Sequence, residues 1–124
     1  MRIGPDSVGP SNYVVPFDHF GGYHYTDTYI RMFSHTHLVG AGVIDLGTIG
    51  VMPITLRKDE VMTPSHLDYL GFRSLFSHDN ETAKPYHYSV HLHRWNVLAE
   101  LTSTQWVGVH RYTFKNNVLS NQRN

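Results

Sequence analysis

The sequence has no cysteine among its 124 residues, and its ten Lys and Arg balance its ten Asp and Glu. The first absence excludes disulfide frameworks, thiolate metal sites and cysteine nucleophiles. The charge balance removes the basic field that attracts nucleic acid, so we expect no nucleic-acid partner. Long apolar runs are also missing, since no stretch approaches the roughly 18 residues of a membrane helix, and we expect no membrane partner.

Other absences concern targeting and size. The first ten residues, MRIGPDSVGP, lack the apolar segment of a signal peptide. The chain is short enough that its length allows either one small domain or part of a larger one. Neither observation fixes where the protein resides, so its localisation is left open.

The chain is rich in aromatic residues (13%) and contains ten Gly and six Pro. This composition favours strands joined by turns. Gly and Pro interrupt residues 1–28, so we predict loop there with one short strand at Tyr13–Phe17. Thr28–His35 is apolar on both alternating faces, which predicts a strand covered on two sides. Leu46–Ile54 is predicted to form another short strand that ends near its proline.

The strongest pattern is YHYSVHLH (residues 86–93), in which aromatic or aliphatic residues alternate with histidine and serine. This alternation predicts a half-buried antiparallel strand. Residues 94–96 predict a turn, and two further strands are expected at 97–104 and 106–114, with Trp106 in the core. Three sequential strands indicate a β-meander with one face on a core, so the predicted fold class is all-β and antiparallel.

Ten histidines are a high number for this length. His35 and His37 form a His-x-His pair, and the period of two in a strand points both rings to one face, where they can bind a metal ion. Asp45 or the second pair, His91 and His93, could supply a third ligand. Spacing does not show whether the pairs meet, and a solvent-facing polar strand face explains His91 and His93 as well.

The loop SHDNE (residues 77–81) offers carboxylates for acid/base chemistry, together with Asp45. We favour a simple turn, in which Asp and Asn bond their own backbone. Trp95 and Trp106 have flat apolar ring faces on which a sugar could stack. No GxSxG elbow or phosphate-binding glycine loop is present, so the residues alone predict a His-rich β domain and no nucleophilic enzyme.

Four long segments, in order, resemble the N-terminal domain of family 92 glycoside hydrolases, the calcium-dependent exo-acting α-mannosidases. They are MRIGPDS (residues 1–7), GGYHYTDTYIRMFSHTHLVGAGVIDLGTIGVMP (residues 21–53), FSHDNETAKPYHYSV (residues 76–90) and AELTSTQWVGVHRYTF (residues 99–114). Four motifs in the right order are far more specific than a single tripeptide. On this resemblance residues 1–114 form a partial family 92-type β-sandwich domain, and residues 115–124 form a polar C-terminal tail.

The resemblance implies a two-part enzyme, in which an antiparallel β-sandwich packs on an (α/α)6 catalytic domain and the mannose site lies in the cleft between them. The family hydrolyses a terminal α-mannosyl bond with inversion, using one carboxylic acid and one carboxylate. Ca2+ binds the mannose hydroxyls. These groups lie mostly in the helical domain, so we expect this chain alone to hold no catalytic residue, no metal and no cofactor, and to be inactive. The expected partners are that domain and mannose-containing glycans, including N-glycans.

In the family, loops of the sandwich reach the cleft, and the SHTH segment of this chain is our candidate for that role. The predicted substrate-binding residues are Ser34, His35, Thr36, His37 and Asp45. Three departures from the family pattern lie in the same segment: Met32 for Gly, Val39 for Ser and Ala41 for Thr. The loss of two hydroxyl groups weakens the prediction that this loop still touches sugar.

The segment RIGPDS aligns after the family's early motif PGAxxPFGM, so we expect an incomplete sandwich that lacks its first strand. Unpaired backbone and exposed apolar surface would then make the isolated chain marginally stable or prone to aggregate. Two alternatives stay open. One is a free-standing carbohydrate-binding module, and the other is a small metalloprotein that uses His35, His37 and a further histidine.

Overall fold

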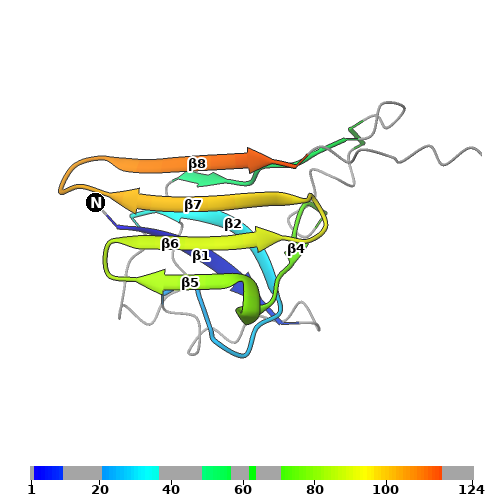
Figure 1. The fold of residues 1–124 in the computed structure, drawn as a ribbon, viewed down its shortest axis with the longest axis horizontal. Coiled ribbons are helices and arrows are strands. Elements are labelled where there is room, and N and C mark those ends of the chain that lie inside the picture. Colours follow the sequence, from blue (N-terminus) through cyan, green and yellow to red (C-terminus); the bar gives the residue numbers. More distant parts are fainter. Residues whose placement is uncertain (1, 10–20, 37–48, 57–61, 64–70, 116–124) are drawn as a thin grey trace, which may run out of the picture.

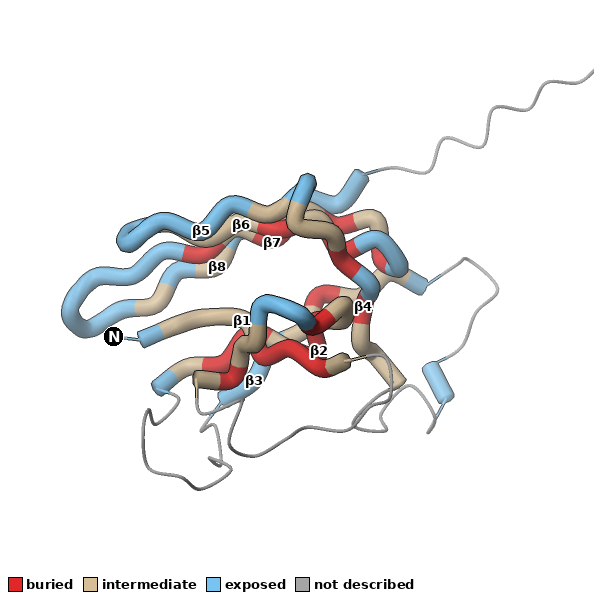
Figure 2. Tube along the Cα trace, turned by 90° about the horizontal axis from the view of Figure 1, so that it is seen from below, coloured by how far each residue is buried: buried red, intermediate tan, exposed pale blue. Residues whose placement is uncertain are grey.

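Two antiparallel sheets pack face to face in the computed structural model, which describes residues 2–9, 21–36, 49–56, 62–63 and 71–115 (Figures 1 and 2). The first sheet is formed by β1 (Ile3–Val8), β2 (Tyr29–His35), β3 (Ile49–Val51) and β4 (Ser74–Leu75). The second is formed by β5 (Glu81–Lys84), β6 (His87–Leu92), β7 (Val97–Ser103) and β8 (Gly108–Phe114). The only helical element in the described ranges is a 3-10 turn, η1 (His78–Asn80). The prediction of an all-β antiparallel fold is confirmed.

The second sheet is the predicted meander, with strands in the order β5-β6-β7-β8. Its inner face carries Val90, Leu92, Val97, Ala99 and Leu101, all of them buried. The turn between β6 and β7 contains Asn96 at φ 52°, a left-handed conformation that asparagine tolerates better than most residues. Alternation of apolar and polar residues identified these strands because one face of the sheet lies on the core.

The N-terminal segment differs from the prediction, because β1 occupies residues that Gly4 and Pro5 suggested were loop. In the described part of the chain β1 pairs only with β2, so it is an edge strand there. An edge strand tolerates proline, since the missing N–H removes no bond from a second neighbour. The predicted strand at Tyr13–Phe17 lies outside the described residues.

Strand β2 is buried on both faces, as its sequence predicted. A β-bulge sets Ser7 opposite Ile30 and Asp6 opposite Met32, so that Arg31 is an extra residue in β2. The bulge lets Ile30 and Phe33 both join the core between the sheets, although their spacing of three does not fit a regular strand. Phe33 is fully buried, with its ring centroid 6.4 Å from Tyr88 and 6.2 Å from Tyr112.

The two tryptophans lie in opposite environments. Trp95 is only 4% exposed, donates its indole N–H to the carbonyl of Phe72 (2.8 Å) and is covered by the guanidinium of Arg94. Trp106 is 77% exposed in the turn between β7 and β8, so its predicted place in the core is wrong. The strand alternation does not extend to Trp106, because β8 begins only at Gly108.

Met32 is accommodated by a glycine on the neighbouring strand β3. A Cβ atom at Gly50 would overlap the sulfur of Met32. The bare backbone of Gly50 therefore supplies the space that the larger residue at position 32 needs.

No helix in the described part of the chain is long and apolar enough to cross a membrane.

Replacement of Phe33 tests the packing between the sheets. Phe33→Ala is expected to lower the free energy of unfolding by about 3–5 kcal/mol, because the change leaves a cavity between Tyr88 and Tyr112. Urea denaturation of the purified chain measures the difference. Val109→Ala, at an exposed position of β8, is the control and should change it by less than about 0.5 kcal/mol. Equally small effects of both variants would contradict this account of the core.

Candidate functional site

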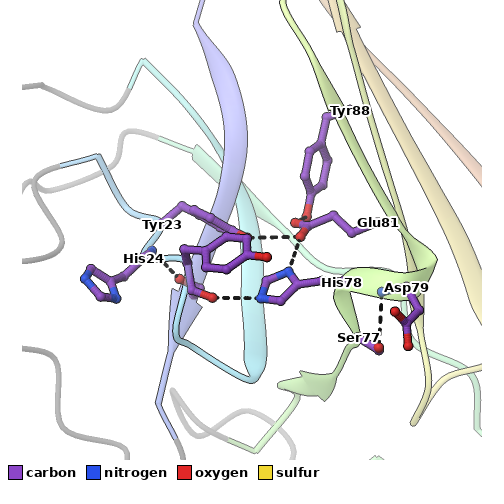
Figure 3. Close-up of polar contacts among 9 residues, drawn as sticks. Tyr23, His24, Ser77, His78, Asp79, Glu81 and Tyr88 are labelled. Carbon is purple, nitrogen blue, oxygen red and sulfur yellow. Dashed lines mark hydrogen bonds and ion pairs between the residues drawn. The ribbon is translucent and has the colours of Figure 1, made fainter.

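A buried carboxylate at the start of β5 organises the first polar site, which we call the Glu81 cluster and which consists of Tyr23, His78, Glu81 and Tyr88 (Figure 3). Glu81 pairs in register with Val90 on the inner face of the second sheet, and its side chain is only 8% exposed. Oε1 accepts from the Tyr88 hydroxyl at 2.6 Å. Oε2 accepts from the Tyr23 hydroxyl at 3.0 Å and from His78 Nδ1 at 2.6 Å.

These three contacts define the electrostatics of the cluster. Burial, followed by the hydrogen bond to Glu81, raises the pKa of both Tyr23 and Tyr88, so both phenols keep their protons. The hydrogen bond to Glu81 raises the pKa of His78 above its usual value. Since three donors already occupy the Glu81 carboxylate, it serves as a structural anion rather than as an available general base.

His78 donates from both ring nitrogens. Nδ1 faces the Glu81 carboxylate, and Nε2 lies 2.7 Å from the carbonyl oxygen of Tyr25. Both partners accept hydrogen bonds only, so this geometry requires the imidazolium form and makes the contact with Glu81 an ion pair. The Tyr25 ring stacks on the imidazole at 4.1 Å between centroids and 4° between planes. The cluster thereby ties residues 23–25 to η1, β5 and β6.

Local turn chemistry presents His78 and Glu81. Ser77 has an extended backbone, and its side-chain oxygen accepts from the backbone N–H of Asp79 at 3.3 Å, at the start of η1. Residues 78–80 form the 3-10 turn, and β5 follows at once. The turn predicted for residues 77–81 is confirmed, and sequence reasoning missed that it aims His78 and Glu81 at Tyr23.

A second polar site lies at the opposite edge of the second sheet, between β2 and β8. The imidazoles of His35 and His110 meet edge to edge, with their centroids 4.8 Å apart and an angle of 11° between planes. Their Nε2 atoms are 2.6 Å apart, and Nδ1 of His110 is 2.7 Å from the Tyr112 hydroxyl. Burial, followed by the charge of His35, lowers the pKa of His110, whereas burial raises the pKa of Tyr112 to about 12.

A third set of polar residues is buried around β1 and β2. Ser34 donates to Asp6 Oδ1 at 2.8 Å, and Ser7 donates to Asp27 Oδ2 at 2.6 Å. Arg31 is buried nearby, and burial lowers its pKa while the charges of Asp6 and Asp27 oppose this effect. The paired serines and carboxylates satisfy one another, as buried polar groups must.

The predicted substrate-binding residues differ in where they lie: two are held by contacts inside the fold, one is exposed, and two are outside the described residues. The Ser34 hydroxyl is buried on Asp6, and the His35 ring points between the sheets toward His110. Thr36 is exposed at φ 55° and its hydroxyl donates to the carbonyl of His35 at 2.8 Å. His37 and Asp45 lie outside the described residues. The contact of this segment with sugar stays a prediction.

The two histidine pairs do not combine within the described ranges. His91 lies on the outer face of β6, where its ring is 5.4 Å from that of His93 and its Nε2 is 3.2 Å from Asn96 Oδ1. His35 instead faces the inner side of the second sheet. No group of three His, Cys, Asp or Glu side chains that could hold a metal ion occurs in the described ranges. His91 therefore lies on the polar strand face that was predicted, whereas His93 is exposed in the turn after β6.

Arg111 lies on the outer face of the second sheet and makes a bidentate ion pair with Glu100, at 2.7 Å from Nε and 2.6 Å from Nη2. The hydrogen bond from Arg111 holds the pKa of Glu100 below its usual range. His87 lies 3.7 Å from the same carboxylate. These contacts cross strands β6, β7 and β8, so Arg111 acts as a strand-to-strand contact here.

Removal of the Glu81 charge tests the first cluster. Glu81→Gln keeps the side-chain shape and is expected to bring the pKa of His78 back toward its ordinary value. The raised pKa means that the ion pair stabilises the fold fully below about pH 6.5, and this contribution is lost as pH rises through the folded-state pKa. NMR titration of the His78 ring measures the change. Glu100→Gln is the control and should leave the titration of His78 unaltered; equal titration curves in all three proteins would contradict the ion pair.

Comparison with known proteins shows which family the chain belongs to. The glycosyl hydrolase family 92 N-terminal domain matches residues 2–123. Two structures of the family GH92 α-mannosidase BT3965 from Bacteroides thetaiotaomicron, the second in complex with mannoimidazole, are 38% identical to the chain, with TM-scores of 0.69 and 0.68. The similarity covers 91% and 90% of this chain.

The chain spans only 15% and 14% of the length of those two mannosidase chains. No curated protein matches it. The family match covers nearly every residue, and the solved structures share both the fold and more than a third of the aligned sequence. The chain therefore belongs to the family of glycoside hydrolase family 92 N-terminal domains.

Proposed function

We propose that the chain serves as the N-terminal β-sandwich of an enzyme that hydrolyses α-mannosides, including those of N-glycans. In this role it forms one wall of the sugar cleft and packs on an (α/α)6 catalytic domain. The observation that carries the proposal is the 38% identity to an α-mannosidase over 91% of the chain. The complex of that relative with mannoimidazole supports a mannoside as the substrate class.

The state of the carboxylates supports a non-catalytic role for the described residues. Inverting hydrolysis needs one carboxylic acid and one free carboxylate, roughly 6.5–9.5 Å apart. Asp6, Asp27 and Glu81 are buried or nearly so and accept hydrogen bonds from serine, tyrosine or histidine, and Glu100 is paired with Arg111. Among the described carboxylates this leaves only Asp79, exposed in η1, whereas the reaction needs two. We therefore assign the acid and the base to the catalytic domain.

Calcium belongs to the same proposal. A hard cation takes several oxygen ligands, and the buried carboxylates of the described residues are already committed to protein donors. They do not fit a calcium site. We place the calcium ligands in the catalytic domain, where the ion would bind hydroxyl groups of the mannose.

The segment that begins at the end of β2 is the proposed contribution to the cleft. Ser34 and His35 hold the end of this strand by contacts to Asp6 and His110. Thr36 then turns the chain with a positive φ, and its backbone N–H donates to the carbonyl of Arg2 at 2.9 Å. In the proposed role these residues position the segment that follows, and Thr36 is the one among them whose side chain is exposed.

An assay of mannose release tests the proposal directly. The purified chain is expected to release no mannose from an α-linked mannobiose, with or without added calcium, because the acid and the base lie elsewhere. The BT3965 mannosidase, assayed in parallel, is the positive control. If this chain releases mannose and a chelator abolishes the release, the assignment of a non-catalytic domain is contradicted.

Exposed aromatic rings favour one second candidate, a carbohydrate-binding module. Tyr86 is 70% exposed and Trp106 is 77% exposed. They lie in the β5–β6 and β7–β8 turns, which are at the same end of the second sheet (Figure 1). The hydroxyl of Thr102 donates to the Tyr86 carbonyl at 2.7 Å, which brings the first turn against the end of β7. Flat exposed rings of this kind suit the apolar face of a sugar.

Binding without turnover would distinguish this candidate. If the turns bind sugar, calorimetry with mannobiose should show binding that Trp106→Ala weakens about fivefold, since a stacked aromatic contact contributes roughly 1 kcal/mol. Leu75→Ala, at an exposed position of β4 in the first sheet, is the matched control. No binding by the unaltered chain would eliminate the module.

A further inference from the structure

Strand β8 lies at the edge of the second sheet, since in the described structure it pairs only with β7 (Figure 1). We propose that this edge binds a second copy of the same chain, whose β8 adds antiparallel to it, so that the second sheets of two molecules join into one. The proposal concerns this chain by itself and does not depend on the proposed function.

The backbone of β8 offers hydrogen-bonding groups on this edge. At one end of the β7–β8 pair, the N–H of Lys115 donates to the carbonyl of Asn96 at 3.2 Å. At the other end, the N–H of Thr104 donates to the carbonyl of Val107 at 2.8 Å. In an antiparallel pair such positions recur at every second residue, so the odd-numbered residues of β8 bond to β7. The even-numbered residues direct their N–H and C=O groups away from β7, and in the described ranges no other strand pairs with them. These residues are Gly108, His110, Tyr112 and Phe114.

The other edge strands carry features that oppose pairing with another chain, and β8 lacks them. Proteins protect sheet edges with short strands, with proline and with lysine. In the described structure β3 has three residues, β5 has four and ends in Lys84, and β1 contains Pro5. Strand β8 has seven residues with neither proline nor lysine, and its one charged side chain, Arg111, is paired with Glu100. Among these edge strands β8 is therefore the best template for an added strand.

The side chains along β8 suit a partner strand of the same sequence. Val109 and Phe114 are exposed, and so are Trp106 and Val107 just before the strand. Exposed apolar side chains that follow one another along an edge are typical of an interaction surface. With Arg111 as the one charge on β8, a partner strand has to place an apolar residue opposite it. A two-fold contact sets the same surface against itself, so each copy can cover the apolar side chains of the other.

The charge of Arg111 selects the register of the pair. A two-fold axis at Arg111 would set the two arginines directly opposite each other, which destabilises paired strands. An axis at His110 sets each Arg111 opposite Val109 of the second copy, and it keeps the even-numbered residues in hydrogen-bonded positions. Only this register also sets the exposed Trp106 opposite the exposed Phe114 of the second copy. We therefore place the axis at His110.

Sedimentation equilibrium of the purified chain tests the self-association. The unaltered chain is expected to form dimers as its concentration rises. Val109→Lys is expected to raise the Kd of the dimer about tenfold, because it sets a lysine opposite Arg111 at two symmetry-related places. Val109→Glu sets a carboxylate opposite the same arginine and should lower the Kd. Thr82→Lys, at an exposed position of the edge strand β5, is the control and should leave it unchanged. A chain that stays monomeric at every concentration would overturn the proposal, and so would equal Kd values for Val109→Lys and Val109→Glu.

Disulfide cross-linking tests the register, since the chain has no cysteine of its own. Val109→Cys and Arg111→Cys are made as separate proteins, mixed and oxidised. The proposed register sets these two positions opposite each other, close enough for a disulfide, so the mixed dimer should form in excess over either symmetric dimer. Oxidation of the same mixture in urea, where the chains are unfolded, gives the statistical yields as the control. Statistical yields under native conditions, or an excess of the dimer that joins two copies of Arg111→Cys, would contradict this pairing.

Discussion

The ring of Phe33, fully buried between the two sheets, is the contact on which the rest of the structure depends. It packs against Tyr88 on one side and Tyr112 on the other. The hydroxyl of Tyr88 reaches Glu81, and that of Tyr112 reaches His110, so each aromatic neighbour ends in a polar cluster. The inner face of the second sheet thus carries an aromatic row across its middle with a hydrogen-bonded cluster at each edge. Each of these two clusters pairs the polar groups that it buries with one another.

The residues that make these contacts lie within the segments that resemble family 92. Tyr23, Glu81, His35 and His110 all lie within the four motifs, and each bonds to a residue from a different part of the chain. Substituting any one of them would strand a buried partner without a hydrogen bond, which costs more than the bond itself contributes. Motifs far apart in the sequence are therefore linked by the same physical requirement.

Regular alternation made the meander predictable, because β6 and β7 each have one face on the core and one in solvent. The same reasoning failed at β1, where Gly4 and Pro5 indicated loop, since an edge strand does not need the hydrogen bonds that these residues weaken. It failed again at Trp106, which lies just beyond the alternating segment. Strand periodicity could not predict that Ile30 and Phe33 both face the core, because a β-bulge breaks the period of two between them.

The sequence by itself determined the family, the all-β class and the strand faces, because these follow from long motifs and from side-chain periodicity along one segment. Only the tertiary structure decided which partners the polar side chains have. His35 looked like half of a metal-binding pair, but β2 turns its ring toward His110, 75 residues away. Glu81 looked like part of a polar loop, and the fold surrounds its carboxylate with two tyrosines and a histidine. Such partners come from separate strands, and no local pattern records the register that brings them together.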